Sequence, residues 1–301
     1  MNVERDYPLA RLTTVRAGGN AELFARPATE AELVELLAWS AAERHAVEVI
    51  GSGSNLLVAD SGVRGLVLKL DGELTSLERE GTHVLCGGGV RLPSAAAKVA
   101  RWGLTGLEFG INIPGTVGGA VRMNANAYGG ELAAVLEWVN ICGPEGSVRR
   151  SPAELGFEYR RSNLRAGEVV SRASFALAEA PPDEVKGTLA EMRGMRREAQ
   201  PSGIKTFGST FKNPDDPRAE GLSAGRLLDA VGARGLSVGG ARFSPKHANF
   251  VENTGTATTA DVLGLMAEGR RLVHERFGVV LEPEVQVLGE PEWPEGWHLQ
   301  G

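Results

Sequence analysis

Short bursts of glycine between hydrophobic segments constrain this fold more than any other feature. The 301 residues include 40 glycines, nearly twice the ~7% that is usual in proteins. They gather in segments such as Gly51–Leu57, GSGSNLL, and Ile113–Gly130, IPGTVGGAVRMNANAYGG. Glycine permits sharp turns and lets a ligand approach the backbone closely. The bursts therefore predict tight turns and close ligand contacts rather than a low-complexity chain.

The first burst matches a dinucleotide-binding loop only in part. Gly51 and Gly53 fit the start of G-x-G-x-x-G, but Leu56 occupies the third glycine position. The residues that follow predict strand, turn and strand, with no helix whose N-terminus could meet a pyrophosphate. No G-K-[ST] of a P-loop is present. Taken alone, this loop favours a phosphate cradle and an ordinary tight turn about equally.

The second burst combines bare backbone with short polar groups. Three glycines occur within five positions, and Pro114 stiffens the entry. Asn124, Asn126 and Tyr128 follow closely. Surface loops are seldom so apolar and so rich in glycine together. Two such loops in one domain indicate a large phosphate-bearing ligand that lies across both, and a dinucleotide such as FAD fits.

Helical spacing and turn residues divide the rest of the chain into elements. We expect helices over residues 28–44, 93–103, 182–201, 224–232 and 258–277. We expect strands over residues 46–50, 62–70, 82–88, 167–177, 241–253 and 279–289, and a hairpin over Leu136–Arg150 that turns at GPEG. This irregular alternation indicates the α+β class rather than a doubly wound sheet. A domain boundary is expected near Ala180.

Composition excludes several classes of protein. Hydrophobic residues make up 42% and charged residues 23% of the chain, as in a soluble globular protein. A net charge of -6 and a pI near 5.6 argue against a nucleic-acid-binding surface. Cys86 and Cys142 lack metal-ligand spacing, so we expect two reduced thiols and no metal. No targeting or membrane-spanning segment is recognisable, which favours the cytoplasm and no membrane partner.

Six motifs in order resemble the UDP-N-acetylenolpyruvoylglucosamine reductases. They are GSGSNLL, IPGTVGGAVRMNANAYGG, YRRS, FGSTFKNP, KHANF and LEPEV, and the resemblance runs from about Leu12 to Gly289. It implies a fold of the vanillyl-alcohol-oxidase type, with two α+β subdomains over residues 1–180 that bind FAD. A C-terminal α+β domain over residues 181–301 would bind the nucleotide-sugar. The tail from about residue 290 is expected to be loosely ordered.

The resemblance also implies a reaction. Non-covalent FAD, reduced by the co-substrate NADPH, would convert UDP-N-acetylglucosamine-enolpyruvate to UDP-N-acetylmuramate in peptidoglycan synthesis. Hydride would go from flavin N5 to C3 of the enolpyruvyl group, and a proton would go to C2. The FAD site would comprise Gly51, Ser52, Gly53, Ser54, Asn55, Leu56, Pro114, Gly115, Thr116, Gly118, Gly119 and Asn124. We expect a monomer.

Three residues match the catalytic positions of the family. Ser209 matches the serine that delivers the proton to C2, and Arg160 matches the arginine that polarises the substrate carboxylate. Arg161 is expected on the opposite face of a strand, so the two arginines exchange roles if the register is off by one. Glu284 matches a glutamate near C2. From the residues alone, a solvated charge on a strand is favoured for Glu284.

Other residues match positions near the substrate, and two depart from the family pattern. Lys212 and Asn213 match substrate contacts, with Asn213 expected at the diphosphate. His247 either contacts the substrate or is a core histidine satisfied by backbone. Asn112 and Asn126 stand where the family usually has small residues, beside the flavin loop. The 48 residues that separate Arg160 from Ser209 indicate the shorter branch of the family, which lacks an extra tyrosine loop.

Two alternatives keep the fold and change the function. A flavin oxidase acting on an alcohol or sugar often binds FAD through a histidine or cysteine at the phosphate loop, and GSGSNLL contains neither. A non-catalytic nucleotide-sugar-binding protein has no need to keep Ser209, Arg160 and Glu284 together.

Overall fold

Helix α1 (Glu30–Ala42) begins directly after Thr29, which caps it. In the computed structural model, which describes residues 2–295 and 297, the Thr29 hydroxyl accepts a hydrogen bond of 3.1 Å from the Glu32 N–H. The Glu32 carboxylate accepts one of 2.7 Å from the N–H of Ala28. The first bond satisfies an N–H group that the first turn of a helix leaves unpaired, and the second holds the chain that enters the helix. Leucines on one face of α1 are buried.

The predicted helices are present, and one more begins inside the second glycine burst. Helix α3 covers Val117–Arg122 because Thr116 caps it, its hydroxyl accepting from the Gly119 N–H. The interpretation of that burst as a continuous loop is therefore wrong. The other helices are α2 (Leu92–Arg101), α4 (Pro182–Ala199), α5 (Ala224–Ala230) and α6 (Thr259–Phe277). Short 3₁₀ turns lie at Leu9–Arg11, Gly72–Thr75, Glu108–Asn112, Leu132–Ala134, Pro152–Leu155 and Pro217–Ala219.

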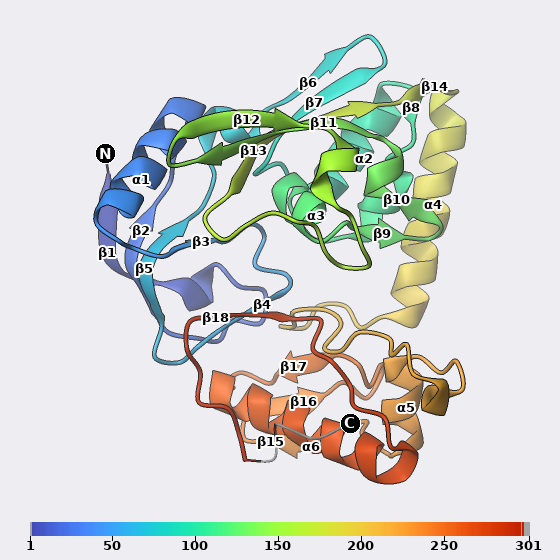
Figure 1. Ribbon diagram of the computed structural model, residues 1–301. Coiled ribbons are helices and arrows are strands. Elements are labelled where there is room, and N and C mark those ends of the chain that lie inside the picture. Colours follow the sequence, from blue (N-terminus) through green and yellow to red (C-terminus); the bar gives the residue numbers. More distant parts are fainter. Residues whose placement is uncertain (1, 296, 298–301) are drawn as a thin grey trace. The chain divides into compact units, whose positions relative to one another are not determined.

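The strands form several small sheets, which confirms the α+β class (Figure 1). One has the order β1-β2-β5-β3, made of Val3–Pro8, Asn20–Ala25, Val63–Leu68 and Val47–Val49. An antiparallel sheet has the order β12-β11-β13-β7-β6, made of Gly146–Arg150, Leu136–Gly143, Val169–Ala176, His83–Gly87 and Leu77–Glu80. Its β11 and β12 form the hairpin predicted from GPEG. A third has the order β15-β16-β17, made of Ser237–Val238, Ala241–Phe243 and Val251–Asn253. Short pairs are β10-β9 (Gly130–Glu131, Asn126–Ala127) and β14-β8 (Ala178–Glu179, Leu104–Thr105).

The chain packs into two compact units that interleave along the sequence. Unit 1 comprises residues 1–5, 22–52 and 64–198, and unit 2 comprises residues 6–21, 53–63 and 199–301. Each has its own core, with Phe175 wholly buried in unit 1 and Phe211 buried in unit 2. Cys86 and Cys142 are buried thiols in strands of unit 1. A single domain boundary near residue 180 stays a prediction.

Residues 53–63 join unit 2 through a parallel strand pair. Strand β4 (Leu56–Val58) pairs with β18 (Gln286–Leu288). Beyond β4, the Asp60 carboxylate accepts hydrogen bonds of 2.9 Å from the N–H groups of Thr259 and Ala260 at the start of α6. A carboxylate at this helix end is stabilised by the helix dipole. The final strand is shorter than the predicted 279–289, since Glu282 and Glu284 pair elsewhere, as described below.

The C-terminal tail is described up to residue 295 and at Trp297. Trp297 is 8% exposed, and the Arg270 guanidinium lies 4.4 Å from its ring centroid. The expectation of loose order for residues 296 and 298–301 falls outside the described residues. Within the part of the chain that is described, no helix is long and apolar enough to cross a membrane.

The loop before β13 is closed by a buried carboxylate. Glu168 is 8% exposed. Its oxygens accept bonds of 2.7 Å from Arg150 and 2.9 Å from the Arg165 guanidinium, and one of 2.8 Å from the Arg165 N–H. Burial alone would raise the pKa of Glu168, but these donors outweigh it and bring the pKa to about 2.

We predict that this cluster stabilises the fold at neutral pH and not in acid. A pKa lowered from 4.5 to about 2 corresponds to about 3 kcal/mol of unfolding free energy. That contribution is present above pH 4.5 and is lost as the pH falls toward 2. Glu168→Gln should therefore lower the free energy of unfolding at pH 7 by about 3 kcal/mol, measured by urea denaturation. The exposed Glu145→Gln is the control, and an equal loss at pH 7 and at pH 3 would contradict the account.

Candidate functional site

The first glycine loop, residues 51–55, presents a row of unpaired backbone donors between β3 and β4. The N–H groups of these five residues donate to no group among the described residues. The Ser52 hydroxyl is buried and likewise has no partner there. Successive N–H groups in a turn form a concave site for an anion. Gly53 has a φ of 63°, and a Cβ there would lie 2.1 Å from the Leu12 carbonyl oxygen, so glycine is required.

The second burst packs against the first loop, and its three closely spaced glycines do not leave the backbone bare. A Cβ at Gly51 would lie 2.5 Å from Oγ1 of Thr116, so the two segments approach closely. The N–H groups of Val117 and Gly118 donate to the carbonyls of Val90 and Gly88, both at 2.8 Å. The N–H groups of Gly115 and Gly119 donate to the Ile113 carbonyl and the Thr116 hydroxyl, so none of the three glycines leaves the backbone bare as expected. That part of the prediction is wrong, because the segment winds into α3 beside residues 88–90.

Among the amides near the second burst, Asn124 keeps an unsatisfied group. Asn124 is 3% exposed; its Nδ2 donates to Glu131 at 2.7 Å, whereas its Oδ1 is buried without a partner among the described residues. Asn112, by contrast, donates from Nδ2 to the Met192 carbonyl at 2.7 Å, and its own carbonyl accepts from Arg196. Asn112 therefore ties α4 to the rest of unit 1, and Asn124 has an acceptor left for a ligand.

Lys69 is a cation beside the first loop that sequence reasoning missed. It follows β5, and its Nζ donates to the Gly51 carbonyl at 2.6 Å. Burial lowers the pKa of Lys69, and the charges of Arg26 and Arg91 lower it further against the opposing effect of Asp71. These cations favour an anion at the loop. The signal in the sequence was only that Lys69 lies at the end of a predicted strand, because the pairing of β5 with β3 appears in the structure and not in the sequence.

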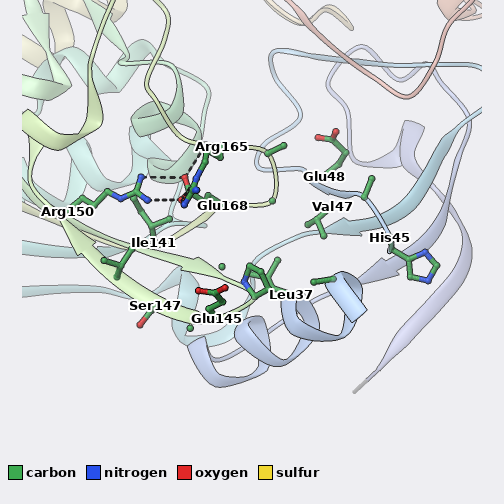
Figure 2. A pocket seen from close by; sticks show the side chains of 18 residues that line it. Leu37, His45, Val47, Glu48, Ile141, Glu145, Ser147, Arg150, Arg165 and Glu168 are labelled. Carbon is green, nitrogen blue, oxygen red and sulfur yellow. Dashed lines mark hydrogen bonds and ion pairs between the residues drawn. The ribbon is translucent and has the colours of Figure 1, made fainter. Parts of the chain in front are cut away.

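A pocket of about 770 Å³ opens in unit 1 between α1, β3 and the β11-β12 hairpin (Figure 2). Leu37 and Val47 line one side, and Ile141 and Glu168 line the other. The dashed bonds in Figure 2 show that Arg150 and Arg165 hold the Glu168 carboxylate. Burial raises the pKa of Glu48, which also lines this pocket. The pocket contains none of the site residues expected from the sequence.

Arg160 lies in a tight turn rather than on a strand. Glu158 and Arg161 exchange backbone hydrogen bonds of 3.0 and 3.2 Å, and Arg160 between them has a φ of 57°. The expectation that Arg160 and Arg161 lie on opposite strand faces is therefore wrong. Arg160 donates from Nη1 to Oδ1 of Asn126 at 3.0 Å, whereas Arg161 lies 3.7 Å from the Glu158 carboxylate with its side chain 74% exposed. This geometry favours Arg160 for a role in a site.

In unit 2, Ser209 lies on an extended segment that is paired on both sides. Residues 209–212 lie between residues 249–250 and 282–284. Thr210 donates its N–H to the Asn249 carbonyl at 2.8 Å, and its own carbonyl accepts from the Glu284 N–H at 2.9 Å. This ladder brings the backbones of Ser209 and Glu284 close together. The Thr210 hydroxyl is buried without a partner among the described residues.

The other expected substrate residues also lie in unit 2. Lys212 pairs with Glu282 at 3.2 Å. Asn213 is exposed. Its Oδ1 accepts a hydrogen bond of 3.1 Å from the N–H of Ala224, the first residue of α5. Asn55, from the first loop, donates from Nδ2 to the Glu284 carbonyl at 3.1 Å. Unit 2 thus places residues of three motifs, GSGSNLL, FGSTFKNP and LEPEV, in one network.

His247 has the contacts of a histidine that orders its own loop. Its Nδ1 accepts from the Asn249 N–H at 3.2 Å, and its ring packs edge-on against Phe250 with centroids 4.9 Å apart. Burial lowers the pKa of His247, so a neutral ring is favoured at pH 7. A structural role accounts for these contacts, and a substrate contact stays a prediction.

Comparison with known proteins relates both parts of the chain to one family. Residues 21–151 match the family described as FAD binding domain, and residues 200–288 match the C-terminal domain of UDP-N-acetylenolpyruvoylglucosamine reductase. A reductase of that name from Symbiobacterium thermophilum is 43% identical over 97% of this chain and 94% of its own length. One from Anaeromyxobacter is 43% identical over 96% of this chain and 89% of its own.

A solved structure has the same fold over almost the whole chain. The crystal structure of UDP-N-acetylenolpyruvylglucosamine reductase from Thermus caldophilus superposes with a TM-score of 0.83 at 39% identity. It covers 98% of this chain and 100% of its own. Together with the match to an FAD binding domain, this confirms the fold class expected from the sequence. Within unit 1, the unpaired N–H groups of Gly51 and Ser52, the Ser52 hydroxyl and the Asn124 acceptor fit the phosphates and polar groups of FAD.

We predict that Gly51→Ala weakens FAD binding by about 10-fold or more. The added Cβ would meet the Thr116 side chain at 2.5 Å, and relief of such overpacking costs about 1–3 kcal/mol. FAD titration of apoprotein, followed by flavin fluorescence, measures the effect. Gly187→Ala is the matched control, since its Cβ meets nothing within 4 Å. Equal FAD affinity in both variants would contradict the close approach of the two segments.

We predict that Lys69→Met weakens FAD binding and flattens its dependence on salt. The Lys69 ammonium adds positive charge at the Gly51 carbonyl, and attraction of a diphosphate to it is screened by salt. FAD dissociation constants measured at low and high ionic strength give both quantities. Lys186→Met, at an exposed position, is the control and should show the same dependence of the FAD dissociation constant on salt as wild type. An unchanged slope in Lys69→Met would show that Lys69 does not act on the cofactor's charge.

Proposed function

Because the chain belongs to the UDP-N-acetylenolpyruvoylglucosamine reductase family, we propose that it reduces UDP-N-acetylglucosamine-enolpyruvate to UDP-N-acetylmuramate with NADPH. The ladder that pairs residues 209–212 with residue 249 and with residues 282–284 carries this proposal. It brings the backbones of a hydroxyl-bearing and a carboxyl-bearing residue together in unit 2. The reaction serves the synthesis of peptidoglycan precursors, and therefore cell shape and division.

FAD would be held without a covalent bond by the loop of residues 51–55 and by Thr116 and Asn124 of the second burst. The loop N–H groups and Lys69 would bind the diphosphate, and Asn124 Oδ1 would accept a hydrogen bond from the cofactor. When bound, FAD would supply the hydride chemistry, accepting a hydride from NADPH and passing one to the enolpyruvyl double bond. No histidine or cysteine lies in the loop, which is consistent with non-covalent binding.

Protonation at C2 is the step that we assign to Ser209. Hydride addition at C3 builds negative charge at C2 and on the adjacent carboxylate. A serine hydroxyl is a weak acid in water, but this carbanionic centre is basic enough to take its proton. The other product of the step is a serine alkoxide, which solvent reprotonates. No acyl group is transferred, so Ser209 has no need to act as a nucleophile.

The negative charge that develops on the substrate is stabilised by hydrogen-bond donors that are already in place before the reaction. We assign the carboxylate to Arg160, whose guanidinium is oriented by Asn126 at 3.0 Å. A planar guanidinium suits a carboxylate because it can donate two parallel bonds. Glu284, adjacent in the ladder to Thr210, would orient the proton donor or the developing enol. Lys212 and Asn213 would bind the diphosphate.

The enzyme would act as a monomer in the cytoplasm, where NADPH and nucleotide-sugars are made. The direct test is to incubate purified protein with NADPH and UDP-N-acetylglucosamine-enolpyruvate and to analyse the product by mass spectrometry. We expect stoichiometric NADPH oxidation and a product heavier than the substrate by two hydrogens. NADPH oxidation that depends on oxygen and leaves the substrate unchanged would contradict the proposal.

We predict that Ser209→Ala loses substrate reduction and keeps flavin reduction. Removal of a positioned general acid typically costs about 10²–10⁴ in rate, and the variant leaves the first glycine loop intact. Turnover with saturating substrate should fall by that factor, while anaerobic bleaching of the flavin by NADPH keeps its wild-type rate. Ser202→Ala, at an exposed position, is the control. A Ser209→Ala enzyme with wild-type turnover would remove Ser209 from the mechanism.

A further inference from the structure

The side chain of Asn249 is buried against the segment that carries Ser209. Asn249 is 4% exposed. Its Oδ1 accepts a hydrogen bond of 2.9 Å from the Phe211 N–H, and its Nδ2 donates one of 2.9 Å to the Phe211 carbonyl. Both polar groups of the Phe211 backbone are therefore bound by one side-chain amide.

The Asn249 amide gives the Phe211 backbone the pair of hydrogen bonds that a neighbouring strand would otherwise supply. Along the same segment, Thr210 donates its N–H to the main-chain carbonyl of Asn249, and Lys212 donates to the carbonyl of Glu282. At Phe211 the Asn249 side chain replaces a backbone partner. The buried Phe211 backbone would otherwise lack partners at this edge, and buried unpaired groups are unfavourable.

The hydrogen bonds between the Asn249 side chain and Phe211, here called the clamp, lie close along the chain to Ser209. Ser209 pairs with Phe250, the residue next to Asn249, and it lies two positions before Phe211. A serine side chain has a single rotatable bond to its hydroxyl, so the position of the oxygen follows the backbone closely. A shift of the segment at Phe211 therefore moves the Ser209 hydroxyl with it.

We propose that Asn249 is a positioning residue for Ser209, with its side-chain amide holding the backbone that aims the proton donor. This inference rests on the proposed function, in which Ser209 protonates C2. Asn249 itself touches no reacting atom. Its loss should slow protonation of the substrate and leave reduction of the flavin by NADPH unchanged, because the FAD loop takes no part in the clamp.

Asn249→Asp gives the sharpest test, because its effect depends on protonation. A neutral carboxylic acid can accept from the Phe211 N–H and donate to the Phe211 carbonyl, as the amide does. A carboxylate can only accept, and it places a charge against that carbonyl. Burial raises the pKa of a carboxyl group, so the variant should be active at low pH and lose activity as the pH rises through that pKa.

Several charged or titratable groups surround this position and are common to all variants. His247 accepts from the Asn249 N–H, and Asp229 and Arg234 act on His247 in turn. Lys212 and Glu282 form an ion pair on the other side of the segment, and Glu284 bonds to Thr210. A fall in rate with rising pH that appears only in Asn249→Asp is therefore caused by the new carboxyl group.

Asn253→Asp is the matched control. Asn253 is also buried in unit 2, and its side chain also binds backbone, donating to the Val15 carbonyl at 2.8 Å and accepting from the Gly255 N–H at 2.8 Å. It should lose stability in the same way, but it does not bond to Phe211. Comparison of the two variants separates positioning from general destabilisation.

The measurement is anaerobic single turnover of NADPH-reduced enzyme with UDP-N-acetylglucosamine-enolpyruvate across a range of pH, below the melting temperature of each variant. We expect Asn249→Asp to lose at least about 10-fold in flavin reoxidation rate from low to high pH beyond any change in wild type, with flavin reduction unchanged. Asn249→Leu should be slow at every pH. Asn253→Asp should follow the wild-type profile.

Three outcomes are decisive. If only Asn249→Asp shows the additional fall in flavin reoxidation rate with rising pH, the inference is supported, even if Asn249→Leu fails to fold. If Asn249→Asp and wild type have the same dependence of reoxidation rate on pH, or if Asn253→Asp shows the same additional fall, the inference is overturned while the proposed function stands. A wild-type enzyme whose reduced flavin the substrate never reoxidises overturns the proposed function itself, and the inference with it.

Discussion

The candidate site in unit 2 depends on one short segment that is hydrogen-bonded along both edges. Residues 209–212 have too few residues to form a stable strand alone, and single backbone hydrogen bonds add little net stability. Their position is fixed because Asn249 binds them on one side and residues 282–284 bind them on the other. That arrangement determines where Ser209 and the backbone of Glu284 lie. It also explains how LEPEV and FGSTFKNP, 70 residues apart at Lys212 and Glu282, come to be hydrogen-bonded to each other.

The cofactor loop relies on a different constraint, the absence of side chains. Among the described residues, no strand accepts from the N–H groups of residues 51–55, where Gly53 adopts a left-handed conformation. In the second burst, Gly115, Gly118 and Gly119 add no further bare donors, because each N–H group is already hydrogen-bonded. Its glycines let α3 begin beside residues 88–90, which places Thr116 against Gly51. The two bursts thus have separate tasks, one presenting donors and the other supporting them.

Local signals predicted the elements well, since capping and turn chemistry act between near neighbours. Thr29 caps α1, GPEG closes the β11-β12 hairpin, and the α+β class follows from such elements. Features that depend on distant contacts were missed. Arg160 lies in a turn with a positive φ, and no pattern in YRRS indicates this. Lys69 and Asn249 became candidates only when the fold placed them beside Gly51 and Phe211. The roles of Ser209, Arg160 and Glu284 came from the resemblance, and they remain proposals.

The central claim is that reduced flavin on this protein delivers its electrons to an enol ether. Anaerobic stopped-flow mixing tests it most directly. Protein with bound FAD is reduced with one equivalent of NADPH and then mixed with UDP-N-acetylglucosamine-enolpyruvate, while the flavin absorbance is followed. We expect a rapid return of the oxidised spectrum without oxygen. A flavin that stays reduced with the substrate, and returns to the oxidised form only when oxygen is admitted, would contradict the account and point to an oxidase.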